Sequence, residues 1–322
     1  MAVTEEPWRV RPKDYPQRGH AARWYRSLEL HLAMGVAVAI LTVLFAGARA
    51  TAGARAALDA RLVTAGAGAN AALVGVESEQ LSAVRAIAFT QGVAAALAAG
   101  DGPKLNTLVT PLQANSTVPM VDVVEPDGSV LLAVRSKGAP PPVSSRKGLR
   151  ALEQALAGAK GARGGRLSKI VIYRSGPTLL TISPIVLDRK PVGAVLAMTP
   201  LADVLGRLSE EVGAQLTAYD SAGDPIATTT SFDPKALDSA TAQTLIGGGA
   251  IVTRVVHSGQ REKLGRLIVG HEPDAVLGVS LADSSADTGR MVSIYVALGF
   301  LGVAAVLGTF WTRTATARSR DR

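Results

Sequence analysis

Two uncharged apolar stretches lie near opposite ends of the 322-residue chain, one from Leu32 to Ala48 and one from Met291 to Trp311. A helix needs about 20 apolar residues to cross the hydrocarbon core of a bilayer. Helices that are apolar on every face are rare in small soluble domains. The pattern therefore predicts two transmembrane helices, over residues 29–48 and 290–311.

Basic residues gather just outside both predicted spans. Residues 1–28 carry six basic and three acidic side chains, and residues 312–322 carry four basic and one acidic side chain. The positive-inside rule places both tails in the cytoplasm, so residues 49–290 lie on the extracytoplasmic side of the cell membrane. Both tails also suit anionic headgroups, so we expect membrane lipid to be a partner.

Cleavage of a signal peptide is the alternative for the first span, because Ala48, Arg49 and Ala50 form an A-x-A pattern. The polar leader and the apolar run are both long for a signal peptide, which favours the membrane helix.

Beyond the first span, apolar residues recur at steps of three or four. They are Leu58, Leu62, Ala65, Ala69, Leu73 and Val76. This spacing predicts one long extracytoplasmic helix over residues 49–102, ended by the Gly- and Pro-containing residues 100–104. Its apolar stripe, with the small-residue pairs Gly35/Ala39 and Ala304/Gly308 in the spans, would suit a homodimer. The equally weighted alternative is that alanine and glycine are simply abundant in this chain.

After residue 103 the hydrophobic period shortens to two, and the pattern then repeats. VDVVEPDGSVLLAV (121–134) is echoed by QLTAYDSAGDPIATT (215–229), each a strand, an Asp/Gly turn and a strand. A helix and three strands follow in both copies. The repeat predicts two stacked modules of one α/β type, a membrane-distal module over 103–200 and a membrane-proximal module over 201–289.

This order of elements resembles the double Cache sensor domains of bacterial membrane receptors. Three motifs over roughly residues 50–290 carry the resemblance: VVEPDGSV, SPIVLDRKPVGAVLAMTPLADVL and LTAYDSAGDPIATT. It implies an α+β fold of two tandem PAS-like modules with antiparallel sheets and a long N-terminal helix. It also implies a small ligand in the distal module and a signal passed to a kinase, cyclase or chemotaxis module.

The chain departs from that family in two respects. It lacks the Tyr/Arg/Trp/Tyr/Asp constellation of the amino-acid-binding subgroup, and residues 312–322 are too few for an output module. We therefore expect a signal to pass to a separate signalling or transport protein. The alternative is a structural or accessory subunit of a cell-envelope assembly that binds no ligand.

Net charge and cysteine count exclude some classes of function. The formal charge is +8, but residues 49–290 hold 24 basic and 21 acidic side chains, so the excess lies largely in the tails and no nucleic-acid partner is expected. The chain has no cysteine, which excludes disulfides and thiolate nucleophiles.

Between Glu125 and Arg174 there are ten basic residues and three acidic ones. Guanidinium groups bind carboxylates with paired hydrogen bonds, so this segment favours a pocket for a small carboxylate or other anion. The candidate ligand-binding residues are Arg135, Arg150, Tyr173 and Arg174, which lie on or beside predicted strands and helices. A solvated basic loop is the preferred interpretation of residues 160–169.

Catalytic and metal-binding patterns are missing from the sequence. There is no nucleophile-elbow, zinc-protease or phosphate-loop motif, and His257 and His271 are too few ligands to specify a metal site. We expect no enzyme activity, no metal and no cofactor.

Overall fold

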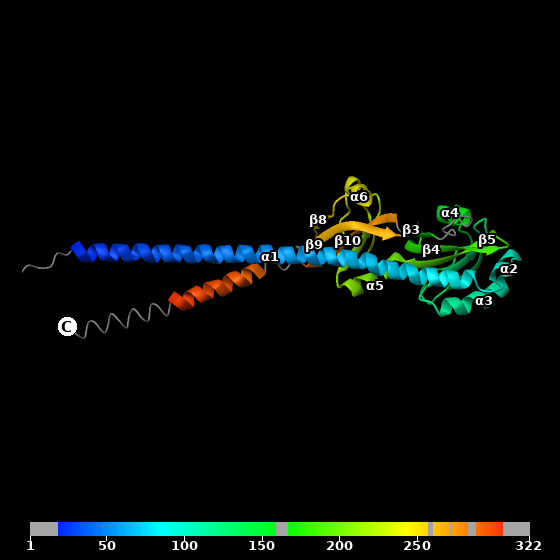
Figure 1. The fold of residues 1–322 in the computed structure, drawn as a ribbon, viewed down its shortest axis with the longest axis horizontal. Helices are drawn as coiled ribbons and strands as arrows, with labels where there is room; N and C mark the ends of the chain where they lie inside the picture. The colour runs from blue at the N-terminus through cyan, green and yellow to red at the C-terminus, as the bar shows by residue number, and fades with distance from the viewer. Residues whose placement is uncertain (1–18, 159–166, 257–259, 271, 283–287, 305–322) are drawn as a thin grey trace, which may run out of the picture. The chain divides into compact units, whose positions relative to one another are not determined.

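The computed structural model describes residues 19–158, 167–256, 260–270, 272–282 and 288–304 (Figure 1). The chain forms two compact units, one of residues 56–283 and one of the residues on either side. Helix α1 (Gly19–Ala88) contributes to both units, and each unit is described by itself.

Two antiparallel five-stranded sheets dominate the unit 56–283, with the strand orders β2-β1-β5-β4-β3 and β7-β6-β10-β9-β8. The distal sheet comprises β1 (Met120–Val124), β2 (Val130–Arg135), β3 (Leu167–Tyr173), β4 (Gly176–Leu187) and β5 (Lys190–Pro200). The proximal sheet comprises β6 (Gln215–Tyr219), β7 (Pro225–Thr228), β8 (Val252–Val255), β9 (Gln260–Val269) and β10 (Glu272–Ala282). The identical order confirms the predicted α+β class with two tandem PAS-like modules.

Helices occupy corresponding places in the two modules. Helix α4 (Arg150–Gly158) follows the second strand of the distal sheet, and α6 (Ser239–Ile246) follows the second strand of the proximal sheet. Helix α5 (Leu201–Val212) joins the modules. Alternate side chains of each strand point to opposite faces, so α4 and α6 cover one face of their sheets and build separate apolar cores there.

The motif that repeats in the sequence forms the same turn in both sheets. Gly128 and Gly223 have φ values of 88° and 93°, a region that glycine adopts without strain. The carbonyl of Gly128 accepts from the N–H of Arg146 at 2.6 Å, and that of Gly223 from the N–H of Leu237 at 2.8 Å. A Cβ on either glycine would collide with this returning chain, so both turns require glycine.

Helix α1 covers the other face of both sheets, running along them in Figure 1. The predicted stripe from Leu58 to Val76 packs against α5 and the proximal sheet, whereas Val84 and Ile87 pack on the distal sheet. This stripe is buried within its own unit, so it is not available to a second copy. The interpretation of the stripe as a dimer contact was therefore wrong.

The long helix ends at Ala88 and not near residue 102. Gly92, with φ of 91°, breaks the helical path. Two further helices follow, α2 (Val93–Ala98) and α3 (Gly102–Ala114). The predicted stop at 100–104 is the junction between them, where the Asp101 carboxylate accepts from the N–H of Lys104 at 3.0 Å and caps α3. The sequence is rich in alanine on both sides of Gly92, so the pattern of residues does not reveal that the helix is interrupted there.

Hydrogen bonds attach the distal sheet to α1 and to the proximal sheet. The buried Gln80 of α1 donates to Thr199 Oγ1 at 2.8 Å and accepts from Thr181 Oγ1 at 2.7 Å. Asp274 of β10 accepts from the N–H of Ile170 in β3 at 2.6 Å. The edge strand β3 is thus bonded to the proximal module as well as to β4.

In the other unit, α1 packs against a helix formed by Thr288–Ala304. Small residues make the contact close: a Cβ on Gly47 would collide with Ser293 Oγ, and one on Gly289 with Thr51 Oγ1. Among the described residues, α1 is the one helix long and apolar enough to cross a membrane. The predicted second span continues past the last described residue.

Candidate ligand pocket in the distal module

A cavity of about 490 Å³ lies on the α4 side of the distal sheet, a volume typical of small-ligand sites. Its walls are the end of β3, parts of β1, β2 and β5, and the loop over 140–149. Residues that matter for its chemistry are Met120, Arg135, Arg146, Tyr173, Arg174 and Met198.

A fully buried carboxylate, Asp122 of β1, holds two of these arginines. Its Oδ2 accepts from Arg146 Nε at 2.9 Å and from Arg146 Nη2 at 2.7 Å. Its Oδ1 forms an ion pair with Arg135 Nη2 at 2.5 Å. A buried carboxylate requires such partners because it has lost its hydration. The two cations and one anion leave a net positive charge in the pocket wall.

Two buried groups in the lining have no hydrogen-bond partner among the described residues, Tyr173 Oη and Arg135 Nε. Burial raises the pKa of Tyr173, with the Arg146 cation opposing the effect, so the hydroxyl stays protonated at neutral pH. The guanidinium of Arg146 lies 4.6 Å from the centre of the Tyr173 ring and fixes its plane. An unpaired buried donor costs about 1–3 kcal/mol, so both groups are suited to a ligand acceptor.

The local chain explains how Arg146 reaches this wall. Prolines 140–142 have no N–H to donate, so the segment before Arg146 forms no ladder. Ser145 then forms an isolated antiparallel bridge with Ser129, and the Arg146 N–H bonds to Gly128. The glycine turn thereby directs the arginine toward Asp122.

The structure brings three of the four predicted residues together: Arg135, Tyr173 and Arg174 line the pocket. Arg150 is the exposed first residue of α4 and is not part of the lining. Sequence reasoning missed Asp122 and Arg146. A signal for both was present, because an acidic residue inside the apolar strand MVDVV needs a buried cation.

The α6 side of the proximal sheet is filled by side chains. Fully buried Tyr219 donates to Glu262 Oε1 at 2.8 Å. Arg254 donates to Glu262 Oε2 at 2.6 Å and to Tyr219 Oη at 2.8 Å, with its guanidinium 5.3 Å from the ring centre. Tyrosine, arginine and carboxylate thus recur in both modules, but here the three bond to one another and leave no free hydroxyl.

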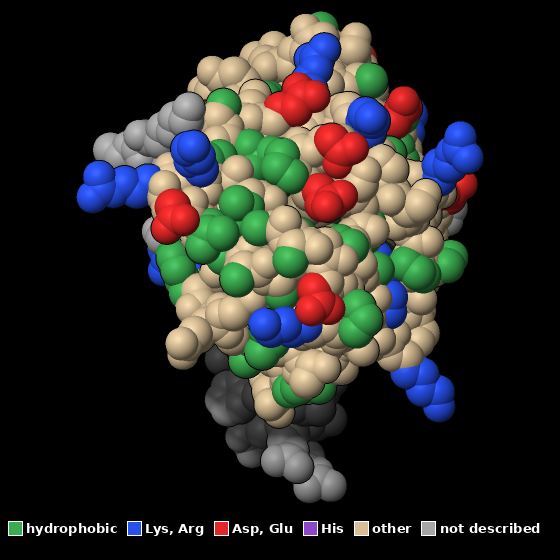
Figure 2. Space-filling view, turned by 90° about the vertical axis from the view of Figure 1, so that its right-hand side faces the viewer, with side chains coloured by type: hydrophobic (Ala, Val, Ile, Leu, Met, Phe, Trp, Pro, Cys, Tyr) green, Lys and Arg blue, Asp and Glu red, His purple; other side chains and the backbone are tan. Residues whose placement is uncertain are grey.

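The end of the distal module formed by α2 and α3 shows mixed charge. Figure 2 looks onto this end, and its basic and acidic side chains are interspersed among the described residues. Nucleic-acid surfaces gather basic residues on one face, which is not the arrangement in this view.

No group of three or more metal-ligating side chains occurs among the described residues. His257 and His271 lie outside them, so the expected lack of a metal site stays a prediction.

No protein-family model and no curated protein matches the sequence. Solved structures do match. The ligand-binding domain of the Campylobacter jejuni chemoreceptor Tlp3 in complex with 4-methylisoleucine aligns with a TM-score of 0.52 and 10% identity, over 73% of this chain and 93% of that chain. The Tlp3 sensory domain with isoleucine bound gives 0.51 and 10%, over 76% and 98%. The chain therefore has the fold of the tandem PAS-like, double Cache sensory domains.

Proposed function

We propose that this protein is a membrane-anchored extracytoplasmic sensor that binds a small organic anion in the distal pocket. The observation that carries the proposal is the pair of unpartnered buried groups, Tyr173 Oη and Arg135 Nε, in a wall of net positive charge. A ligand carboxylate would accept from both. The fold shared with ligand-binding chemoreceptor domains supports a sensor role.

The proposal is one of binding without catalysis and without a cofactor. The ligand-free alternative, a structural or accessory subunit of a cell-envelope assembly, gains some support from the closed Tyr219–Glu262–Arg254 cluster. That cluster shows that this fold can fill its pocket with its own side chains.

The proposed topology has two spans, both tails in the cytoplasm in contact with lipid, and residues 49–290 outside. Arginine-rich flanks on both predicted spans support it. The test is a reporter enzyme that works only outside the cytoplasm, fused after Arg322. Activity of this reporter would refute the topology.

A ligand-dependent change has an effect only if some component responds differently to the two states. We include in the proposal a separate signalling or transport protein contacted through the spans, and a homodimer. A face of α1 with exposed small residues at steps of three and four supports the homodimer; these residues are Ala57, Ala60, Thr64, Ala67, Ala71, Val74 and Ser78. Crosslinking in native membranes, followed by mass spectrometry, tests both partners.

The ligand proposal is tested with the full chain in lipid nanodiscs. Thermal unfolding is followed with hydroxy-, keto- and dicarboxylic acids, and with amines and neutral molecules of equal size. We expect one or more anions to raise the midpoint in the wild type and less so in Tyr173→Phe and Arg174→Gln. Lys104→Gln, on exposed α3, is the matched control and should respond like the wild type. A panel without any shift would favour the structural subunit.

A further inference from the structure

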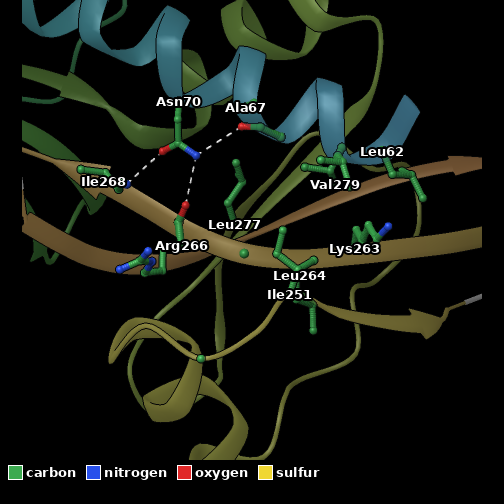
Figure 3. A pocket seen from close by; sticks show the side chains of 14 residues that line it. Leu62, Ala67, Asn70, Ile251, Lys263, Leu264, Arg266, Ile268, Leu277 and Val279 are labelled. Atoms are coloured by element: carbon green, nitrogen blue, oxygen red, sulfur yellow. Dashed lines mark hydrogen bonds between the residues drawn. The ribbon is translucent and has the colours of Figure 1, made fainter. Parts of the chain in front are cut away.

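A second cavity, of about 270 Å³, lies in the proximal module between α1 and β9 (Figure 3). Leu62, Val63 and Ala67 of α1 form one wall, and Leu277 and Val279 of β10 form the other, with residues 263–266 of β9 along the edge. We call this space the α1–β9 groove. The chemistry of the distal pocket does not account for it, because none of its lining residues belongs to that pocket.

Two glycines keep the groove open. A Cβ on Gly265 of β9 would meet no atom within 4 Å, so a missing side chain leaves space in the sheet wall. Across from it, a Cβ added to Gly66 of α1 would lie 3.5 Å from Val279 Cγ2, an ordinary contact that would take up part of this space. Neither glycine has a positive φ that would require it for backbone reasons.

The groove is bounded at one end by a fixed contact. Asn70 Oδ1 accepts from the N–H of Ile268 at 3.0 Å, and its Nδ2 donates to the carbonyls of Arg266 at 3.1 Å and Gly66 at 3.2 Å. The amide therefore pairs with the edge of β9 as a neighbouring strand would, as Figure 3 shows. Helix and sheet are held at this point, and the unfilled space lies next to it.

The lining combines apolar side chains with two cations and contains no carboxylate. Lys263 and Arg266 lie toward opposite ends of the row of labelled residues in Figure 3. Lys263 Nζ donates to the carbonyl of Asp59 at 3.2 Å and has no acidic partner within the described residues. The Arg266 side chain likewise forms no hydrogen bond or ion pair with the described residues. Val63 and Ile251 at the rim are 43% and 55% exposed.

We propose that the α1–β9 groove binds a small carboxylate with a hydrocarbon tail. The tail would replace water against Leu62, Leu277 and Val279, and the carboxylate would lie at Arg266. An apolar cavity of about 150 Å³ accepts a benzene ring, so this groove has room for a tail of somewhat larger size. Because the groove lies between α1 and the sheet, a bound molecule would contact both and could change the distance between them.

The test uses octanoate as the probe and the full chain in nanodiscs, with empty nanodiscs to subtract partition into lipid. Binding is measured by calorimetry. Gly265→Val and, from the helix side, Ala67→Leu fill the groove; each should weaken octanoate at least tenfold. Gly265→Val should also raise the unfolding midpoint without octanoate, because it fills a cavity on a strand. A folded variant of either kind that binds octanoate like the wild type overturns the proposal.

Two further variants separate charge and site. Arg266→Gln should weaken octanoate by up to about fivefold, as for exposed ion pairs, and leave octanol unchanged. Tyr173→Phe alters the distal pocket alone and should leave octanoate binding unchanged. A loss of octanoate binding in Tyr173→Phe would place octanoate in the distal pocket, which would refute the groove and support the distal anion site. Wild-type binding no greater than that of empty nanodiscs would refute the groove without bearing on the distal anion site.

Discussion

Replacing Asp122 by asparagine removes the buried negative charge behind the wall of the distal pocket while keeping the shape of the side chain. The carboxylate is fully buried, and the side chains of its partners Arg135 and Arg146 are only 12% and 9% exposed. Both cations would remain out of water without their counter-charge. We therefore expect a large loss of stability, local to the pocket wall.

The magnitude follows from the number of bonds and their burial. Breaking a buried ion pair from one side costs about 3–5 kcal/mol, and the remaining amide oxygen favours the lower end. For a unit of this size a loss of about 3 kcal/mol lowers the unfolding midpoint by about 6–12 °C. Asp233, which is exposed and has no hydrogen-bond or ion-pair partner among the described residues, supplies the control: Asp233→Asn should change stability by about 0.5 kcal/mol or less.

The assay is thermal unfolding of the full chain in nanodiscs, with and without added acetate. Acetate should recover more stability in Asp122→Asn than in the wild type, because a free anion can replace the missing charge on the two arginines. Hydrogen exchange should locate the change to β1 and the loop at 140–149. Equal midpoints for Asp122→Asn and Asp233→Asn would refute the assignment of Asp122 as the counter-charge of both arginines.

Four other substitutions test separate features. Tyr173→Phe should stabilise the ligand-free protein by about 1 kcal/mol, since an unpaired buried hydroxyl is removed, and should weaken anion binding; a lower midpoint would contradict this. Gly128→Ala should destabilise by about 1–3 kcal/mol because its φ is positive and its Cβ meets the returning chain, and limited proteolysis should then cut the 140–149 loop. Glu262→Gln should reduce the free energy of unfolding by about 3 kcal/mol and leave the anion affinity of the distal pocket unchanged; altered affinity would refute the independence of the Tyr219–Glu262–Arg254 cluster. Asp274→Ala should speed hydrogen exchange at Ile170, which loses its acceptor, and unchanged exchange there would show that this contact does not form in solution.

The duplicated architecture was predictable because both modules carry the same local signals. A proline- or glycine-containing turn between alternating strands, at Gly128 and again at Gly223, fixes the hairpins. The apolar spacing of α1 identified its buried face. These are short-range features, and a single sequence displays them directly.

The details of the pocket depend on contacts far apart in the chain. Asp122 and Arg146 are separated by 24 residues, and Arg146 meets Tyr173 only after the sheet has formed. The count of charges in the basic segment began at Glu125 and so omitted Asp122, the buried acid that pairs with Arg135 and Arg146. The predicted end of α1 was wrong because alanine, a strong helix former, is frequent on both sides of Gly92, so the sequence shows no change there. The helix ends where the packing of α2 on the distal sheet requires it.

The attachment of β3 both to β4 and to the proximal module has a mechanical consequence. Seven residues of extended chain span about 23 Å and are nearly inextensible, since stretching requires deformed bond angles. Tyr173 is at the pocket end of this strand, and the hydrogen bond from Ile170 to Asp274 fastens the strand at its middle, three residues away. A displacement of Tyr173 along the strand cannot be absorbed by stretching or compressing the strand itself. It must either shift the proximal hairpin or break one hydrogen bond, so the response of this element to force is stepwise.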